Sequence, residues 1–344
     1  MIDIAVIGLG DLGRIESDIC ANHPDVQLVA GVDPNADARY EYQTTFDVPV
    51  YEEYDEMLTA HDTLLDAAIV ATPHTLHYEQ ALACLERDLD VFIEKPMVTD
   101  IAEAVALVDC ADEHERILQV GYQRHFHPAY QHIKQLIDDG ALGRIHTINC
   151  FLGQDWIRNN TDSWRSTPSL SGGGQLYDSG SHLLDVLLWT TDTEPKTVAS
   201  TIECRDHEVD INTAVAATLS RNGHPITASI GITADGTSTS GTEEGLYVWG
   251  TEGRLAYGKD GLHLYGKGEG DRDTLRQIEI GPSPDFHELV ERKVTNFLGA
   301  VRNEHDAAVP GSFGLAVTAM TEAIYQSHET GQRVDVDFAD RTAV

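Results

Sequence analysis

The chain has 344 residues and carries 57 Asp and Glu against 23 Lys and Arg, which gives a formal net charge of −34. This excess of acid repels nucleic acids and anionic membranes, so neither is expected as a partner. Because 41% of the residues are hydrophobic, we predict a folded protein of about two domains and exclude a disordered acidic chain.

The cysteines and the N-terminus give no sign of export. Five cysteines are scattered along the chain without C-x-x-C spacing, so neither a disulfide framework nor a metal site is predicted. Met1 leads directly into an apolar stretch without a basic leader, and no apolar run reaches the roughly 18 residues of a membrane span. We therefore expect a cytoplasmic protein.

The basic residues are mostly arginine, with six Lys among the 23. A protein of such negative charge repels itself in dilute buffer, whereas at about 1 M salt the Debye length falls to about 3 Å and the repulsion is screened. We hypothesise a salt-rich cytosol, as in a halophile. The alternative is a protein that is simply acidic and soluble.

Short apolar runs alternate with amphipathic stretches in the first third of the chain. This βαβ pattern predicts a doubly wound parallel sheet in a first domain, residues 1–122. The predicted strands are 2–7, 27–32, 67–71, 90–93 and 117–120, with helices such as 77–89 and 101–114 between them.

The pattern of apolar and polar residues changes after Gly121. A second α/β domain, residues 123–344, is predicted to hold an open, mostly antiparallel sheet, because its β-rich runs are punctuated by glycine. Its strands are predicted at 144–152, 197–205, 214–219, 227–232, 247–249, 262–265 and 334–336, its helices at 129–138, 285–303 and 312–327, and a glycine-rich loop at 171–174.

A dinucleotide fingerprint follows the first predicted strand. Gly8, Gly10 and Gly13 form G-x-G-x-x-G at the start of a predicted helix, and Asp33 ends the next strand. The glycines allow a tight turn and the close approach of a pyrophosphate, helix amides supply the positive end, and Asp33 can accept hydrogen bonds from a ribose. The alternative is a glycine-rich turn in an unrelated βαβ fold. Asp11 inside the loop would repel a phosphate unless its side chain points outward.

The residue types around Asp33 favour NAD over NADP. A carboxylate at this position repels a 2′-phosphate, and no cation follows in the sequence before Arg39. Arg39 could bind that phosphate and high salt would screen the repulsion, so NADP stays an alternative.

Further polar groups follow other strand ends, where an open α/β sheet binds its ligand. Thr72-Pro73 follows one strand and Glu94-Lys95-Pro96 the next, and a G-G-G-x-L-x-D-x-G-x-H-x-x-D motif spans residues 172–185. In this order, the motifs resemble the Gfo/Idh/MocA family of NAD(P)-dependent oxidoreductases, over nearly the whole chain. The family pairs an N-terminal Rossmann domain with a C-terminal α/β domain built on an open, largely antiparallel sheet.

The resemblance implies a catalytic group of Lys95, Asp178 and His182, and a cis bond between Lys95 and Pro96. Oxidation of an alcohol requires loss of the hydroxyl proton as hydride leaves, and a histidine suits that proton step. Lys95 can stabilise the developing alkoxide. We prefer His182 as the proton acceptor, but the sequence leaves Lys95 as the alternative. Asp178 and His182, four residues apart, share a helical face if that segment is helical. The candidate cofactor-binding residues are Gly8, Gly10, Asp11, Leu12, Gly13, Asp33, Thr72, Pro73, His77, Glu94 and Gln123.

The sequence indicates the substrate-binding residues less clearly than the cofactor-binding ones. The family commonly has a second arginine after Arg124, where this chain has His125, so no substrate contact is assigned to His125. Each candidate lining residue could equally serve packing or a salt bridge. These candidates are Arg124, Asp155, Trp164, Arg165 and Tyr177.

The prediction is an NAD(P)-dependent dehydrogenase that oxidises a secondary alcohol or hemiacetal carbon of a small neutral sugar or polyol. One alternative is an NAD-assisted glycoside hydrolase of the same family. Another is a ligand-sensing regulatory protein without catalysis. By resemblance, we expect a homodimer or homotetramer formed through the C-terminal sheet.

Overall fold

The computed structural model describes residues 1–236, 242–267 and 273–338 of the chain. These residues divide into two compact units. The first contains Met1–Gln123 and Pro284–Leu315, and the second contains Arg124–Ser283 and Ala316–Val344. The division therefore falls within the last helix, α11 (Gly311–Thr330).

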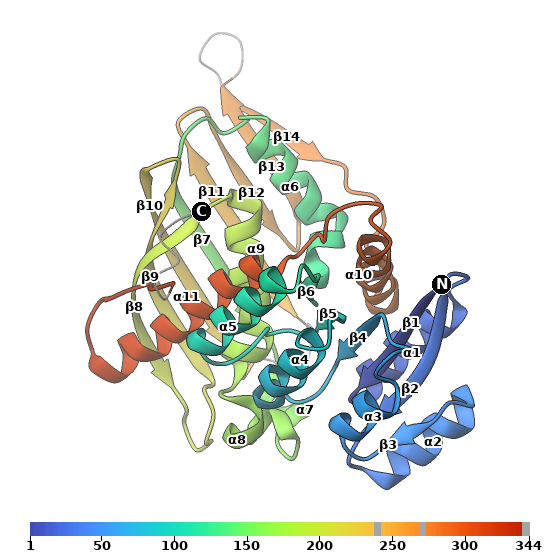
Figure 1. Ribbon diagram of the computed structural model, residues 1–344. Helices are drawn as coiled ribbons and strands as arrows, with labels where there is room; N and C mark the ends of the chain where they lie inside the picture. The colour runs from blue at the N-terminus through green and yellow to red at the C-terminus, as the bar shows by residue number, and fades with distance from the viewer. Residues whose placement is uncertain (237–241, 268–272, 339–344) are drawn as a thin grey trace. The chain divides into compact units, whose positions relative to one another are not determined.

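The first unit is built on a parallel sheet with the strand order β3-β2-β1-β4-β5-β6 (Figure 1). The order reverses between β1 and β4, which makes the sheet doubly wound, and sheets of this kind bind their ligands at such a point. Its central strands β1, β4 and β5 are mostly apolar and buried, as expected for a sheet covered on both faces. The strands are β1 (Ile2–Ile7), β2 (Val26–Val32), β3 (Val50–Tyr51), β4 (Ala67–Val70), β5 (Asp90–Ile93) and β6 (Leu118–Val120).

Helices connect these strands, and several begin where the sequence supplies a cap. Asn35 and Asp100 accept hydrogen bonds from backbone amides of the first turns that follow them. The predicted parallel sheet is confirmed, whereas β3, α2 and α3 were not predicted. The helices are α1 (Asp11–Asn22), α2 (Ala36–Phe46), α3 (Tyr54–Ala60), η1 (His74–Leu76), α4 (His77–Leu85), α5 (Ile101–Glu113) and, from the C-terminal part of the chain, α10 (Phe286–Val301).

Helix α10 belongs to the first unit although it lies far along the chain. Val290, Val294 and Phe297 are fully buried in the same core as the strands β1 and β4, and the Phe297 ring centroid lies 5.6 Å from that of Phe92. The sequence prediction had placed this segment in the second domain. An apolar helix face shows that the helix is covered, but it does not show which sheet covers it.

The second unit is built on a mixed sheet with the order β14-β13-β12-β11-β7-β10-β9-β8-β15. Only the pair β7 and β10 is parallel among its described strands, so the prediction of a mostly antiparallel sheet is confirmed. The strands are β7 (Ile145–Gly153), β8 (Glu194–Glu203), β9 (Asn212–Arg221), β10 (His224–Thr233), β11 (Glu243–Gly250), β12 (Gly253–Gly258), β13 (Gly261–Lys267), β14 (Asp273–Ile278) and β15 (Val334–Asp335).

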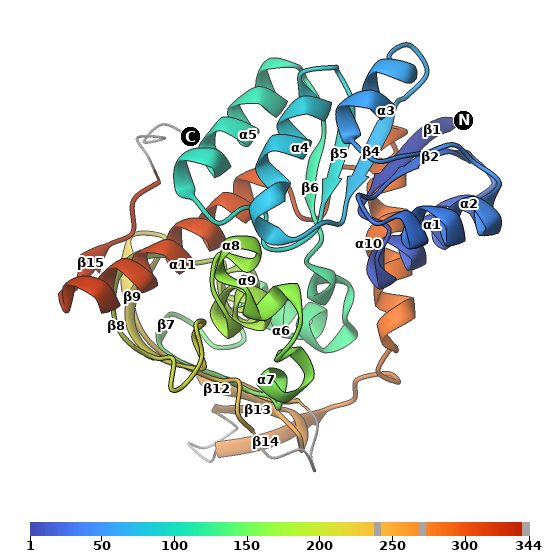
Figure 2. The ribbon, with the colours of Figure 1, turned by 90° about the horizontal axis from the view of Figure 1, so that it is seen from below.

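Helices lie on one face of this sheet, and Figure 2 shows α6 and α9 above the strands. The alternation of buried and exposed residues along β9 and β10 matches this one-sided cover. The helical segments are η2 (Gln123–Phe126), α6 (Pro128–Asp138), α7 (Trp156–Asn160), η3 (Trp164–Ser166), α8 (Pro168–Ser171), the π-helix η4 (Leu176–Gly180) and α9 (Ser181–Thr191). Among the described residues, no helix combines the length and the apolar character that a bilayer span requires.

Candidate functional site

The glycine-rich turn after β1 leaves open space at the start of α1. Gly8 has a φ of +97°, which favours glycine, and a Cβ there would lie 2.6 Å from the carbonyl oxygen of Ala71. A Cβ on Gly13 would overlap the carbonyl oxygen of Gly8. A Cβ on Gly10 would meet nothing within 4 Å. The chain itself therefore requires Gly8 and Gly13, whereas Gly10 keeps clear the space where a pyrophosphate would approach the helix amides.

The Asp33 carboxylate is held in place beside this turn. Its Oδ2 accepts a hydrogen bond from the Leu9 amide at 2.9 Å, and its Oδ1 accepts one from the Asn35 amide at 2.8 Å. Each oxygen keeps a further lone pair, so the carboxylate can accept from ribose hydroxyls. The residues of this turn therefore fit a dinucleotide. Leu12 packs against the core of the unit, and Asp11 is exposed.

Arg39, the nearest cation to Asp33 in the sequence, is already engaged. Its Nη1 donates to the backbone oxygen of Asp33 at 2.7 Å, and its Nη2 lies 3.1 Å from Glu52 Oε2. The side chain of Arg39 is 19% exposed. A 2′-phosphate at this site would have to compete with Glu52 for the guanidinium.

His77 joins the loops that follow β4 and β5. Its Nε2 lies 2.9 Å from the Thr72 oxygen and its Nδ1 lies 2.9 Å from the Pro96 oxygen, and the ring is fully buried. Burial lowers the pKa of His77 and favours the neutral ring, which can donate to one of these oxygens at a time. The ring therefore fixes two loops, and a contact between His77 and a cofactor stays a prediction. The Lys95–Pro96 peptide bond is cis.

The other predicted residues of the first unit lie at the same ends of the strands. Thr72 and Pro73 follow β4, Lys95 follows β5, and Gln123 follows β6. The Glu94 side chain turns inward instead, because its carboxylate is buried and paired with Lys293. A contact between Glu94 and the cofactor is therefore open only to its backbone, and it stays a prediction.

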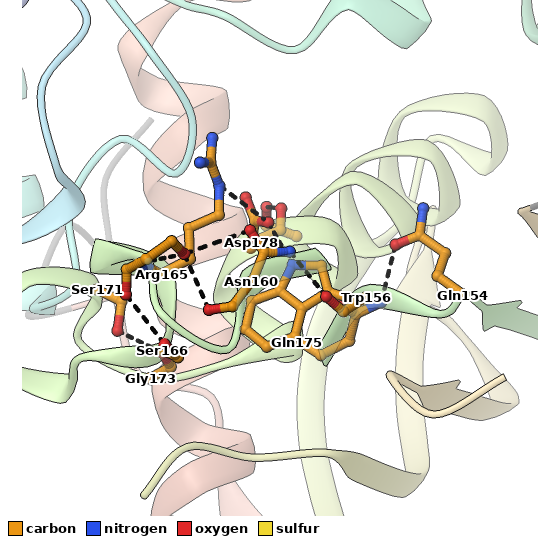
Figure 3. Close-up of polar contacts among 11 residues, drawn as sticks. Gln154, Trp156, Asn160, Arg165, Ser166, Ser171, Gly173, Gln175 and Asp178 are labelled. Atoms are coloured by element: carbon orange, nitrogen blue, oxygen red, sulfur yellow. Dashed lines mark hydrogen bonds and ion pairs between the residues drawn. The ribbon is translucent and has the colours of Figure 1, made fainter. Parts of the chain in front are cut away.

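In the second unit, the Asp178 carboxylate is buried and contacts Trp156 and Arg165 (Figure 3). The indole Nε1–H of Trp156 donates to Asp178 Oδ2 at 2.6 Å, and the Nε of Arg165 lies 3.4 Å from the same oxygen. The guanidinium of Arg165 also lies over the ring of Trp164, 4.5 Å from its centroid. A hydrogen bond to a carboxylate together with an ion pair fixes the orientation of that carboxylate.

Asp178 and His182 lie in consecutive helical segments. Asp178 is in the π-helical turn η4, and His182 is in the first turn of α9. Such π-helical turns inside helices occur frequently at functional sites. His182 is 8% exposed, so its ring is largely shielded from bulk water.

A buried carboxylate anchors the loop that leads into this helix. Asp210 accepts hydrogen bonds from the amides of Gly174 and Leu176, at 2.5 and 2.7 Å, and from the hydroxyl of Tyr325. The Tyr177 ring stacks on Tyr325 with a centroid distance of 5.1 Å. Burial raises the pKa of Asp210, while these donors oppose the rise. Sequence reasoning missed Asp210, Tyr325 and Trp156, because no spacing in the chain ties them to the motif.

The glycine run of this loop is explained by the same anchor. A Cβ on Gly173 would overlap the Tyr325 hydroxyl, and one on Gly174 would overlap the backbone of Asp210. Glycine at these two positions therefore lets the loop pack directly against Tyr325 and Asp210. Gln175 continues the loop and donates to Gln154 Oε1 at 3.0 Å.

The other substrate-side candidates are engaged within the second unit. Arg124 Nη2 lies 2.7 Å from Glu244 Oε2, and Asp155 lies 3.4 Å from Arg158. The predicted substrate roles of Arg124, Asp155, Trp164, Arg165 and Tyr177 stay predictions.

His125, the departure from the family pattern, has a definite place. Its Nε2 lies 2.7 Å from Asp185 Oδ1, the last aspartate of the 172–185 motif, and both residues are buried. Its ring stacks on Trp189 at a centroid distance of 4.0 Å. Histidine at this position therefore supports helix α9.

The predicted catalytic residues are divided between the units. Lys95 belongs to the first unit, and Asp178 and His182 belong to the second, so their meeting at one active site stays a prediction. In the described ranges, no group of three His, Cys, Asp or Glu side chains could hold a metal ion.

Comparison with known proteins identifies the family. A model described as "Oxidoreductase family, NAD-binding Rossmann fold" matches residues 2–122, and one described as "GFO/IDH/MocA C-terminal domain" matches residues 130–256. The chain belongs to the Gfo/Idh/MocA family. The first unit is thus an NAD-binding Rossmann domain, and the protein is an NAD-dependent oxidoreductase.

The relatives extend over most of the chain. An inositol 2-dehydrogenase of Rhodococcus jostii is 29% identical over 82% of this chain and 78% of its own length. A D-xylose 1-dehydrogenase [NADP(+)] of Haloarcula marismortui is 26% identical over 88% of this chain and 82% of its own. A levoglucosan dehydrogenase solved with NADH shares the fold, with a TM-score of 0.85 at 21% identity over 98% of this chain and 99% of that one.

Proposed function

We propose that this oxidoreductase is an NAD-dependent dehydrogenase that oxidises a secondary alcohol or hemiacetal carbon of a neutral sugar or polyol. The observation that carries the proposal is the buried Asp178 carboxylate, fixed by Trp156 and Arg165 one helical turn before His182. A protein that only senses a ligand has no need of such a fixed carboxylate beside a proton acceptor. The names of the relatives, an inositol 2-dehydrogenase and a D-xylose 1-dehydrogenase, support the substrate class.

In the proposed mechanism, His182 takes the proton of the substrate hydroxyl. Lys95 stabilises the alkoxide that develops as the proton leaves, or itself accepts the proton in the alternative assignment. Asp178 acts as an electrostatic and orienting partner of this site. Bound NAD would supply the hydride acceptor for this reaction.

We propose NAD as the preferred cofactor over NADP. Asp33 would repel a 2′-phosphate, and Arg39 is engaged by Glu52 and by the backbone of Asp33. The relative from Haloarcula marismortui carries NADP(+) in its name, so both cofactors must be compared. The ratio of kcat/KM for NAD and NADP measures the preference.

The activity is tested with a panel of aldoses, inositols and sugar acids, at low and molar KCl, with the absorbance of reduced nicotinamide as the readout. The His182→Asn and Lys95→Met variants should bind NADH as the wild type does and lose kcat by about 100-fold or more. A normal kcat in either variant contradicts its role. Release of free monosaccharide without net NADH indicates the glycoside hydrolase, and NADH binding without turnover of any compound indicates the sensor.

We also propose that the protein self-associates through the uncovered face of the second unit's sheet. A groove of about 720 Å³ lies on β7–β11, and its lining residues in the described part of the chain, such as Phe151, Ala216 and Tyr247, include no charged side chain. Such a face is unusual on a chain of net charge −34 and suits a second copy with the same surface.

Light scattering tests the association directly. The wild type should be a dimer or tetramer, and Ala216→Arg should shift it to smaller species. Ala102→Arg, at an exposed position on α5, is the control that should leave the oligomer unchanged. A monomeric wild type contradicts the proposal.

The proposed setting is a cytoplasm rich in salt. Two features of the sequence support this proposal: the net charge of −34 and the small share of lysine, six among the 23 basic residues.

A further inference from the structure

Three ionisable side chains are buried together in the first unit, and the proposed reaction uses none of them. Glu16 on α1, Glu94 after β5 and Lys293 on α10 are 0%, 4% and 1% exposed. Lys293 Nζ lies 3.0 Å from Glu16 Oε1 and donates to Glu94 Oε1. The ammonium also lies over the ring of Phe92, 5.2 Å from its centroid. The cluster thus joins the helix of the dinucleotide turn, the strand before Lys95 and a helix from the far end of the chain.

The charges of this cluster balance only if one carboxyl keeps a proton. Fully ionised, two carboxylates and one ammonium would leave an uncompensated negative charge in an apolar surrounding. Burial raises the pKa of Glu16 to about 8. For Glu94, burial is outweighed by the Lys293 ammonium, so the pKa of Glu94 is lowered. At neutral pH, Glu16 is the neutral acid, and Glu94 and Lys293 form the ion pair.

The ion pair is connected to the loop that carries Lys95. Glu94 Oε2 accepts a hydrogen bond from the Lys95 amide at 3.2 Å. A Cβ on Gly121, at the end of β6, would overlap the Glu94 carboxylate, so a glycine there makes room for it. On the other side, Gln119 donates to the backbone oxygen of Lys293 at 3.1 Å. These contacts hold the Glu94 carboxylate in one orientation. The carboxylate in turn fixes the start of the loop that carries Lys95.

We propose that Lys293 is a positioning residue for Lys95, because its ammonium fixes the Glu94 carboxylate that holds the Lys95 amide, while Glu16 keeps the cluster neutral. The inference rests on the proposed function only for the catalytic importance of Lys95. The position of Lys95 itself is a property of the loop and can be measured without turnover.

The cluster also makes the loop sensitive to alkaline pH. When Glu16 ionises, it competes with Glu94 for the ammonium of Lys293. The other titratable groups near the pair are Cys20, which faces Glu16, and His77 and Lys95, which face Glu94. Burial raises the pKa of the Cys20 thiol and lowers that of His77, so both are neutral at pH 8. The expected alkaline step near pH 8 therefore belongs to Glu16.

The test follows Lys95 by NMR of the reductively ¹³C-methylated protein, in which the chain's six lysines give few signals and K95R identifies the one of interest. In K293M, the Lys95 signal should move and titrate differently, and kcat should fall about tenfold or more while the dissociation constant of NADH changes less than about threefold. Lys196→Met removes an exposed lysine of the second unit and should leave the Lys95 signal unchanged. An unchanged Lys95 signal and kcat in K293M overturn the proposal.

Glu16→Gln provides the second arm, and it decides the question if K293M does not fold. The neutral amide replaces a neutral acid, so the variant should match the wild type at pH 7 and lack the step of the Lys95 signal near pH 8. The proton on Glu16 stabilises the folded wild type because its pKa lies above the ordinary 4.5, and this contribution is lost as the pH rises through about 8. The same alkaline step in E16Q and wild type overturns the proposal. If K95M keeps a normal kcat, the proposed role of Lys95 in catalysis is wrong. The NMR signal still decides whether Lys293 positions Lys95.

Discussion

The anchor of the glycine-rich loop can be weakened by the removal of one hydroxyl group. In Tyr325→Phe, the ring remains stacked on Tyr177, but Asp210 loses one of its donors. Asp210 is 3% exposed, so water cannot replace the lost donor. A hydrogen bond to a charged group contributes about 1.5–3 kcal/mol, and the free energy of unfolding should fall by about 2 kcal/mol.

Urea unfolding followed by tryptophan fluorescence measures this change, because all four tryptophans lie in the second unit. Tyr40→Phe is the control, since Tyr40 is 72% exposed and its loss should change the free energy of unfolding by less than about 0.5 kcal/mol. Because Asp210 also holds the amides of Gly174 and Leu176, Y325F should lower kcat more than it weakens NADH binding. A Y325F protein as stable as Y40F would refute the anchoring role of Asp210.

Three further predictions concern the cofactor turn, the cofactor preference and salt. Gly13→Ala should destabilise the fold by about 1–3 kcal/mol through overlap with Gly8, whereas Gly10→Ala should keep the melting temperature and weaken NADH binding about tenfold; equal melting temperatures for the two variants contradict the assignment. Glu52→Gln should release Arg39 and raise the NADP-to-NAD ratio of kcat/KM about threefold, and an unchanged ratio shows that Glu52 does not restrain Arg39. The melting temperature should rise by several degrees between dilute buffer and molar KCl, and equal stability in both speaks against adaptation to salt.

The cofactor turn could be predicted from the sequence because its parts are local. Gly8, Gly10 and Gly13 lie in one strand–turn–helix segment, and Asp33 ends the next strand. The physical reason for a glycine differs among the three positions, and only the three-dimensional structure shows it. The placement of α10 could not be predicted, since its apolar face would fit either sheet.

The supports of the candidate catalytic residues could not be predicted for a different reason. Trp156, Asp210 and Tyr325 are ordinary residue types at no diagnostic spacing, and they reach the motif only through tertiary folding. Position along the chain assigns His77 and Glu94 to the cofactor, and these contacts stay predictions. The structure adds that the His77 side chain fixes two loops and that the Glu94 side chain belongs to a buried cluster. Strand ends identify a region of function, but side-chain partners decide the role of each residue within it.

The central claim is hydride transfer from an alcohol carbon to nicotinamide, and isotope transfer tests it most directly. The wild type is incubated with NAD and a sugar or polyol deuterated at the carbon to be oxidised, and the reduced cofactor is analysed by mass spectrometry. We predict deuterated NADH from the wild type and none above background from His182→Asn. The absence of deuterium from the reduced cofactor, or its equal transfer in His182→Asn, would contradict the account.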